Sequence, residues 1–318
     1  MKIHEIIDRQ QDPCVSFEII PPARGQSAQD LYAVIDELIG FHPPFIDVTS
    51  HAADAYFKQN PDGRYERHIK RKRPGTIGLC AAIQYRYKVE AVPHLLCYGF
   101  NRNETEDALI ELNYLGIQNV LAVRGDKMEH QKDAAPDRPV NASSHELVQQ
   151  IVAMNQGQYQ EDILNAEKTD FCIGVGGYPE KHPESPSKEA DVRYLKQKVD
   201  AGAHYVVTQM FFDNQDFYTF EDRCRQAGID VPIIPGLKMI THRKQLHMLP
   251  QSFAVNIPDQ LVTAMEEAAS AAERREIGIK HLVNQCEDLL NHGVTNLHFF
   301  VMQDALRIKK VIETLKML

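Results

Sequence analysis

A carboxylic acid lies within one of the most apolar stretches of the chain. In the sequence VSFEIIPP (Val15–Pro22), Glu18 is flanked by Phe17 and Ile19, and two prolines follow. The apolar residues are typical of a buried strand, which the prolines end. Burial disfavours the charged form of a carboxyl group and raises its pKa. Glu18 is therefore either an acid placed for chemistry or a buried acid paired with an arginine such as Arg124.

Polar residues also follow most of the other apolar runs. These residues are Thr49, His94, Arg124, Gly125, Asp126, Tyr178 and Gln209. Each has an ordinary alternative explanation: a buried histidine can be satisfied by its neighbours, and Gly-Asp is common in turns. Because the carboxyl ends of parallel strands meet at one face of a sheet or barrel, the set as a whole indicates one shared pocket.

Short apolar runs alternate with longer amphipathic stretches from end to end. We predict strands at Val15–Ile20, Phe45–Ser50, Ala91–Tyr98, Asn119–Asp126, Phe171–Pro179, Tyr205–Asp213, Val231–Gly236 and Leu297–Met302. Nearly continuous apolar strands are typical of parallel sheets that are covered on both faces. Between them, we predict helices that include Ser27–Phe41, Asn103–Gly116 with Asn103 as N-cap, Ser187–Gly202 and Asn214–Gly228.

Eight such units predict a closed (β/α)₈ TIM barrel, an α/β fold, as a single catalytic domain over residues 1–318. Pro258–His292 predicts extra helices before the last strand. The alternative is an open doubly wound sheet. It is disfavoured because no G-x-G-x-x-G follows a strand, and the nearest match, Gly174–Pro179, ends in proline.

Composition narrows the class of protein. The formal charge of −9 argues against nucleic acid as the main partner, so we interpret the basic run Arg67–Arg73 as the solvated face of a helix. No apolar run reaches the roughly 18 residues of a membrane span. The six cysteines form no C-x-x-C pair, so we expect a cytoplasmic protein. We expect no metal, although His51, His94 and Cys97 leave a zinc site as an alternative.

Seven motifs together resemble one known family. They are SFEIIPP, PHLLC, LAVRGD, YPEKHPE with the following ADVRYLKQKVDAGA, TQMFFD, DVPIIPG and HFF. Their order and gaps, from about Val15 to Phe300, are similar to those of methylenetetrahydrofolate reductase. The resemblance implies an FAD-dependent oxidoreductase of one-carbon metabolism and methionine biosynthesis. Such an enzyme passes a hydride from NADH or NADPH through the flavin to 5,10-methylenetetrahydrofolate, in ping-pong fashion, and yields 5-methyltetrahydrofolate.

The resemblance gives Glu18 a role. Opening the imidazolidine ring of the folate requires a proton on N10, which leaves an electrophilic iminium at N5 for the hydride. A carboxylic acid with a raised pKa can carry that proton near neutral pH, and Glu18 matches the glutamate that serves as general acid in the family.

The resemblance also implies a binding site. Implied flavin-binding residues are Thr49, Ser50, Ala52, His94, Arg124, Gly125, Asp126, Tyr178, His182, Ser185, Asp191 and Lys198. Lysine is a suitable point charge for a diphosphate. Asp126 is implied to tune the flavin potential and to contact the folate pterin as well. Gln209 and Gln245 are implied to bind the folate, with Gln209 also touching the nicotinamide. Relatives of bacterial type imply a homo-oligomer without allosteric control.

Some positions depart from the family pattern. Leu249 replaces a phenylalanine that packs on the ligand, and Asp304 lies where an arginine for the folate tail is expected. Tyr194 and Gln197 replace an asparagine and an arginine of the flavin helix, and His51 replaces a glycine.

Two other classes of function stay open at this point. One is a metal-dependent barrel lyase or aldolase that uses His94, His182 and Asp126. The other is a barrel without enzymatic activity that binds folate or nucleic acid, with Arg67–Arg73 as its contact.

Overall fold

Parallel strands form the centre of the molecule. The computed structural model describes residues 1–10, 12–52, 54–70, 73, 75–125, 138–302 and 304–315, with the backbone alone at 54, 55, 69 and 70. The parallel strands are β1 (Cys14–Ile19), β2 (Phe45–Val48), β5 (Glu90–Leu96), β6 (Asn119–Val123), β7 (Cys172–Gly177), β8 (Tyr205–Thr208), β9 (Ile233–Ile234), β10 (Gly236–Leu237) and β11 (Asn296–Met302). Their order in the sheet is β10-β11-β1-β2-β5-β6-β7-β8-β9.

The two ends of this sheet meet at Pro235. β9 pairs with β8, whereas β10 pairs with β11, and Pro235 alone separates β9 from β10. Proline lacks the N–H that the ladder needs, so the strand predicted at Val231–Gly236 is divided in two. The Pro235 carbonyl still accepts a hydrogen bond from the His298 N–H at 3.1 Å. The sheet is therefore a nearly closed barrel with eight strand positions, and the predicted (β/α)₈ TIM barrel is confirmed.

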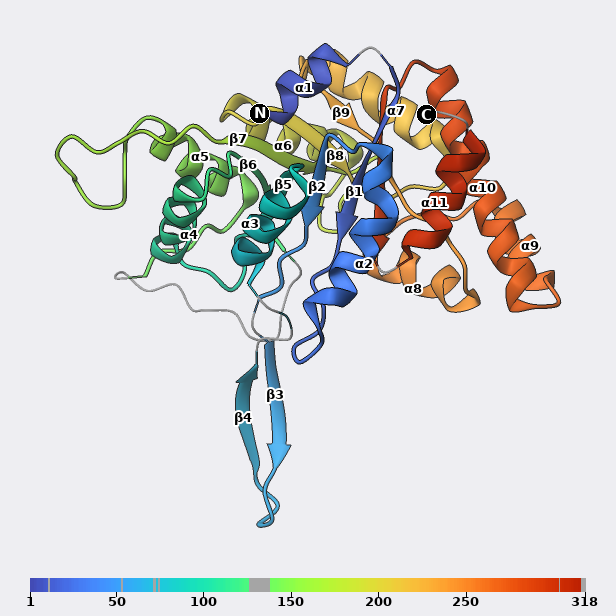
Figure 1. The fold of residues 1–318 in the computed structure, drawn as a ribbon, viewed down its shortest axis with the longest axis horizontal. Helices are drawn as coiled ribbons and strands as arrows, with labels where there is room; N and C mark the ends of the chain where they lie inside the picture. Colours follow the sequence, from blue (N-terminus) through green and yellow to red (C-terminus); the bar gives the residue numbers. More distant parts are fainter. Residues whose placement is uncertain are drawn as a thin grey trace.

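Helices surround the barrel (Figure 1). They are α1 (Ile3–Arg9), α2 (Ala28–Leu38) with the 3₁₀ turn η1 (Ile39–Phe41), α3 (Thr76–Tyr87), α4 (Arg102–Tyr114), α5 (Ser144–Asn155), α6 (Lys188–Asp200), α7 (Asn214–Gln226), α8 (Arg243–Phe253), α9 (Asp259–Glu267), α10 (Ala271–Asn291) and α11 (Ala305–Leu315). α9 and α10 lie within Pro258–His292 and precede β11, which confirms the predicted extra helices. No helix in the described ranges has both the length and the apolar character needed to cross a membrane.

Local sequence signals explain where the helices begin. The Ser187 side chain accepts a hydrogen bond from the Ala190 N–H at 3.1 Å and caps α6 as predicted. The predicted cap Asn103 is wrong by two residues. Asn101 is the N-cap of α4, because Glu104 then falls at the third helical position and returns a bond to the Asn101 N–H at 2.9 Å.

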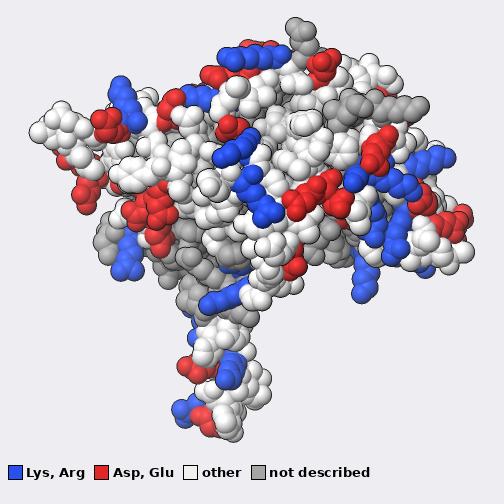
Figure 2. Space-filling view, viewed as in Figure 1, with Lys and Arg blue, Asp and Glu red and all other residues white. Residues whose placement is uncertain are grey.

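The basic run was assigned to the wrong type of element. β3 (Asp54–Gln59) and β4 (Tyr65–Lys70) form an antiparallel hairpin that projects from the body of the molecule (Figure 1). The helical face predicted at Arg67–Arg73 is therefore wrong, at least through Lys70. The turn sequence between the strands, Asn60 to Gly63, is the local signal for a hairpin. On the face shown in Figure 2, acidic and basic side chains are interspersed.

The barrel interior is apolar toward the amino ends of its strands, and α1 closes that end. Ile3 of α1 is fully buried in one cluster with Phe45, Val92, Leu121 and Tyr205, which come from four different strands. This end of the barrel is called the base below. Figure 1 shows α1 on the opposite side of the molecule from the hairpin, which follows the carboxyl end of β2.

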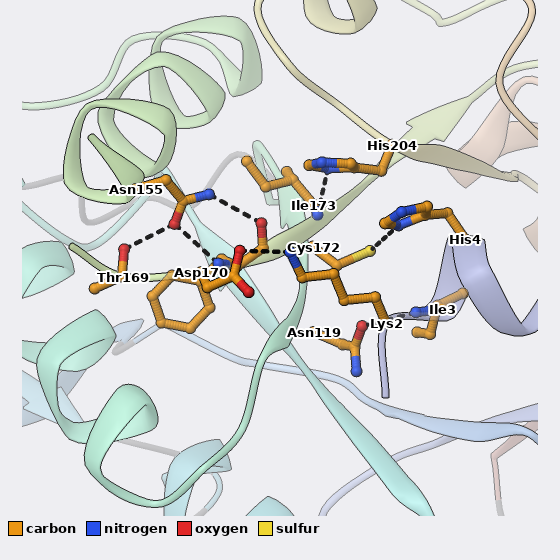
Figure 3. A network of polar contacts seen from close by, with 11 residues as sticks. Lys2, Ile3, His4, Asn119, Asn155, Thr169, Asp170, Cys172, Ile173 and His204 are labelled. Atoms are coloured by element: carbon orange, nitrogen blue, oxygen red, sulfur yellow. Dashed lines mark hydrogen bonds and ion pairs between the residues drawn. The ribbon is translucent and has the colours of Figure 1, made fainter. Parts of the chain in front are cut away.

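Several polar side chains at the base hydrogen-bond to backbone groups (Figure 3), whereas the buried Tyr205 hydroxyl has no partner among the described residues. The Asn119 side chain accepts a hydrogen bond from the Ile3 N–H at 3.0 Å and donates one to the Met1 carbonyl at 2.9 Å. His204 Nδ1 accepts from the Ile173 N–H at 3.0 Å, and the His204 ring stacks on His4 at 5.0 Å. Burial, together with nearby positive charge, lowers the pKa of His204 to about 4, so this histidine is neutral.

Candidate functional site

Glu18 lies near the carboxyl end of β1, and its side chain is 14% exposed. Its Oε2 atom is 3.6 Å from Nε2 of His94 on β5. Burial raises the pKa of Glu18 to about 7. The neighbouring His94 opposes that shift, Asp47 adds to it, and Lys238 opposes it. Glu18 therefore holds a proton over part of its population at neutral pH. The alternative partner, Arg124, is paired elsewhere, with Glu184 at 2.6 Å.

The register of the strands brings a second acid to Glu18. In the β1–β2 pairing Glu18 lies opposite Asp47, and in the β2–β5 pairing Val48 lies opposite Pro93, directly before His94. Asp47 is completely buried. Its Oδ2 atom is 4.0 Å from His94 Nε2, which is an electrostatic contact longer than a direct hydrogen bond.

A further histidine lies on the other side of Asp47. Nε2 of His298, on β11, is 3.5 Å from Asp47 Oδ2, and its Nδ1 shares a hydrogen bond of 2.9 Å with the Ser16 hydroxyl. Burial lowers the pKa of His298 to about 4, so His298 is neutral. Sequence reasoning missed both Asp47 and His298, although each interrupts an apolar run in the same way that Glu18 does.

Five predicted residues gather around the carboxyl ends of β6 and β7. Arg124 contacts His182 Nε2 at 3.3 Å, and the His182 ring meets Tyr178 edge to face at 4.7 Å. Asp191 of α6 accepts from the His182 N–H at 3.0 Å and from the Ser185 hydroxyl at 2.7 Å. The loop between β7 and α6 is thereby tied to the first turn of its own helix. Burial and the charge of Arg124 lower the pKa of His182.

Lys198 lies two turns further along α6, on the side that faces the barrel. Its ammonium group is buried and donates to the Gly176 carbonyl at 2.6 Å. Burial lowers the pKa of Lys198 to about 8, while the charge of Asp191 opposes the shift. Tyr194 and Gln197, which depart from the family pattern, are both exposed on the same helix.

The loop after β2 carries three predicted residues in the order Thr49, Ser50 and Ala52. Thr49 donates its N–H to the Ile19 carbonyl at 3.1 Å, and its buried hydroxyl has no hydrogen-bond partner among the described residues. Ala52 is buried against Gly99, where an added Cβ would lie 2.5 Å from the Ala52 Cβ. Gly99 has φ +84°, so both space and conformation require glycine there.

One further predicted residue, Gly125, lies near the end of β6. Gly125 has φ +84°, and an added Cβ would lie 3.4 Å from Leu96. Asp126 lies outside the described residues, so the predictions that it contacts flavin and folate stay predictions.

The predicted folate residues follow later strands. Gln209 comes directly after β8, and its side chain accepts from the Met210 N–H at 2.9 Å. Gln245, in the first turn of α8, accepts from the N–H groups of Thr241 and His242 at 2.8 and 3.0 Å. Both side-chain oxygens therefore accept hydrogen bonds within the protein. Their roles stay predictions.

The departures at Leu249 and Asp304 have clear structural counterparts. Leu249 is buried in an apolar cluster with Met210 and Leu246. Asp304 forms an ion pair with Arg307. Lys238, directly after β10, interacts with both Glu18 and Asp304, and its burial lowers its pKa. Lys238 is a cation at the mouth of the barrel that sequence reasoning did not single out.

Over the described part of the chain, no three side chains of His, Cys, Asp or Glu are grouped as metal ligands would be.

Two groups of polar residues characterise the mouth. One is the buried set of Glu18, His94 and Asp47, below which His298 stacks on Phe45 of the base cluster. The other is the hydrogen-bonded set around Arg124 and Asp191.

Comparison with known proteins gives a consistent result. The family model of methylenetetrahydrofolate reductase matches residues 2–316. The chain is 33% identical over 331 residues to methylenetetrahydrofolate reductase 2 of Saccharomyces cerevisiae, with 100% of this chain and 50% of the yeast protein covered. It is 32% identical over 294 residues to 5,10-methylenetetrahydrofolate reductase of Salmonella typhimurium, with 92% and 86% covered. The chain thus spans half the length of the yeast relative.

A solved structure has the same fold. An uncharacterized protein from Clostridium thermocellum, which binds two copies of 5-methyl-5,6,7,8-tetrahydrofolic acid, superposes with a TM-score of 0.59. The match covers 99% of both chains at 12% identity, and at that identity it shows the fold alone.

Proposed function

Because this chain belongs to the methylenetetrahydrofolate reductase family, we propose that it reduces 5,10-methylenetetrahydrofolate to 5-methyltetrahydrofolate, with NADH or NADPH as the hydride donor. The observation that carries the proposal is Glu18, a carboxyl group with a pKa of about 7 near the carboxyl end of its strand. The active sites of TIM barrels lie at that end.

Glu18 acts as the general acid. The folate ring opens when the bond between its bridging carbon and N10 breaks, and the electron pair of that bond takes up a proton at N10. Glu18 supplies this proton, because its burial keeps part of the population protonated at neutral pH. The bridging carbon, now an iminium carbon on N5, accepts the hydride and becomes the methyl group. One proton and one hydride balance the reaction.

The residues of the mouth fit an FAD cofactor. When bound, FAD would accept a hydride from NAD(P)H and deliver it to the folate. The unpartnered hydroxyl of Thr49 offers a polar contact beside a buried loop. His182 and Tyr178 offer an aromatic wall, and Lys198 and Arg124 offer positive charge for a diphosphate. The ion pair of Arg124 with Glu184 would have to rearrange or be shared for that contact to form.

The folate would lie on the side of Gln209, Gln245 and Lys238. The amide groups of the two glutamines can donate hydrogen bonds to a pterin or to its linker, since their carbonyl oxygens are occupied. Lys238 is the described cation whose charge reaches Glu18 and Asp304, and we assign it to the anionic tail of the folate.

The test is anaerobic spectroscopy of the purified protein supplied with FAD. We expect the visible flavin absorbance to fall on addition of NADH or NADPH. It should return on addition of 5,10-methylenetetrahydrofolate, with 5-methyltetrahydrofolate as the product. A protein that binds no flavin, or whose absorbance stays low with the folate present, would contradict the proposal.

The variant Glu18→Gln separates the acid from the rest of the site. We expect loss of the folate step by about 10²–10⁴-fold, because the amide cannot donate the required proton. Flavin binding and bleaching by NADH should stay near wild type, since neither step uses that proton. An equal loss of both steps would show that Glu18 is structural. Asp288→Asn, on the exposed side of α10, is the control and should leave both steps unchanged.

A further inference from the structure

We propose that Asp47 is a positioning residue that keeps His94 positively charged beside Glu18, so that the His94 cation assists Glu18 in releasing its proton. The inference rests on the proposed function of Glu18. It adds to the site Asp47, which holds the charge on His94, and the neutral His298 as the other neighbour of Asp47.

The surroundings of Asp47 show that its charge is used locally. Both carboxylate oxygens are buried, and neither has a hydrogen-bond donor among the described residues. A buried carboxylate without donors is costly, so its retention needs a compensating interaction. The only basic groups within 4.0 Å of it in the described structure are the Nε2 atoms of His298, at 3.5 Å, and of His94, at 4.0 Å.

Only one of the two histidines is suited to carry the positive charge. His298 has a pKa of about 4, because burial outweighs the attraction of Asp47. For His94, burial also lowers the pKa. The interaction with Asp47 and the charges of Asp47 and of ionised Glu18 outweigh burial, and the pKa of His94 is raised above its ordinary value. While Glu18 holds its proton, Asp47 supplies this attraction alone. His94 lies between two acids, whereas His298 faces one.

Charged and titratable groups on every neighbouring element agree with this assignment. The charge of Lys238, after β10, also acts on Glu18. Burial, and to a smaller extent the charge of Asp47, raises the pKa values of Tyr205 on β8 and Cys80 on α3 well above the ordinary ones. Both groups are therefore neutral. Among the described residues, the charged groups around a protonated, neutral Glu18 are Asp47, His94 and Lys238.

The arrangement favours proton release. When Glu18 gives its proton to N10, the O–H electron pair stays on the carboxylate, 3.6 Å from the His94 imidazolium. Attraction between opposite charges at this distance, with little water between them, stabilises the carboxylate as it forms. Without Asp47, burial would drive the proton off His94, and the carboxylate would form beside a neutral ring.

The first test needs neither cofactor nor activity. We would follow the histidine ring signals of the ligand-free protein by NMR over pH, with His94→Gln to assign the His94 signal. We expect His94 to titrate above the ordinary histidine range in wild type and well below it in Asp47→Asn. The same His94 titration in both proteins would overturn the inference.

The second test uses the Glu18 titration and the folate step. In Asp47→Asn the loss of the His94 cation outweighs the loss of the Asp47 charge, since His94 has the larger effect on Glu18. The pH above which the folate step declines should therefore move upward. The rate below that pH should fall about tenfold, because Glu18 becomes a weaker acid. A purely structural role would change stability without moving the pH profile, and an unmoved profile would count against the inference.

The two proposals can fail separately. If no variant or wild type reduces the folate, the proposed function fails, and the NMR titration still decides the state of His94. If Asp47→Asn does not fold, the carboxyl titration of Glu18 in His94→Gln replaces it. Removal of the cation should raise the pKa of Glu18, and an unchanged or lowered value would overturn the inference.

Discussion

The two ends of the barrel differ in their buried ionisable groups, although the Tyr205 hydroxyl at the base also lacks a hydrogen-bond partner among the described residues. At the base, Asn119 and His204 make specific hydrogen bonds, and His204 is kept neutral (Figure 3). At the mouth, Asp47 and His94 Nε2 have no hydrogen-bond partner among the described residues, and the acid Glu18 has a pKa of about 7. Both ends are buried, so burial alone does not explain the difference.

We infer from this difference that the base contributes mainly to stability and the mouth to chemistry. Satisfied polar groups fix a unique packing of α1 against the strands, whereas unsatisfied charges are retained only where a function compensates for their cost. We therefore expect substitutions at the base to change the free energy of unfolding and leave the titration of Glu18 unchanged. Substitutions at the mouth should change the titration of Glu18, and they should leave the free energy of unfolding unchanged or increase it.

The largest stability effect should come from the base. Ile3→Ala removes a fully buried side chain from the apolar cluster that closes the barrel. We expect a loss of about 3 kcal/mol in the free energy of unfolding, measured with urea. Ile7→Ala on the same helix is the matched control and should cost less, because Ile7 is only partly buried. A shift in the Glu18 titration in either variant would contradict the expectation that substitutions at the base change stability alone.

A smaller effect, of opposite sign, is expected at the mouth. Glu18 has a folded pKa of about 7 against an ordinary value of 4.5, so the unfolded chain releases this proton first as the pH rises. The contribution of Glu18 to stability is therefore complete below 4.5 and is lost as the pH rises through 7. Glu18→Gln does not titrate, so it should gain about 1–3 kcal/mol over wild type between pH 4.5 and pH 8.

Urea unfolding of both proteins at several pH values measures this gain. If the free energies of unfolding of wild type and Glu18→Gln differ by the same amount at every pH, Glu18 has the same proton affinity in the folded and unfolded states.

The smallest effect is expected for a surface pair at the base. The Asp170 side chain, which pairs with Lys2, is 67% exposed. Asp170→Asn should change the free energy of unfolding by less than about 0.5 kcal/mol, since exposed ion pairs contribute little. A larger loss would show that the packing of α1 against the base is stabilised by this ion pair as well as by apolar contacts.

The sequence was sufficient to predict the parts of the fold that have a strong period. The barrel, the extra helices before β11 and the cap at Ser187 all follow from apolar runs and capping residues. The hairpin was missed because a short basic run fits a helix face and a strand equally well without knowledge of its partner strand. Pro235 divides one strand in two, which affects the pairing without changing the number of strand positions.

The candidate site was predicted only in part, for a physical reason. Glu18 and His94 were found because they lie near strand ends in apolar runs. Asp47 and His298 were missed because their significance depends on the register between neighbouring strands, which sets their distances. In the same way, nothing in the local sequence shows that Arg124 pairs with Glu184 and leaves Glu18 to His94.

The proton on Glu18 at neutral pH can be observed directly. The carboxyl carbon of Glu18 can be followed by NMR in protein labelled with carbon-13 at glutamate, with Glu18→Gln to assign the signal. We expect a titration near pH 7, because burial at the mouth raises the pKa of Glu18. A titration near the ordinary value of 4.5 would mean that Glu18 is charged at neutral pH, and it would contradict both the role of Glu18 as proton donor and the contrast between the two ends of the barrel.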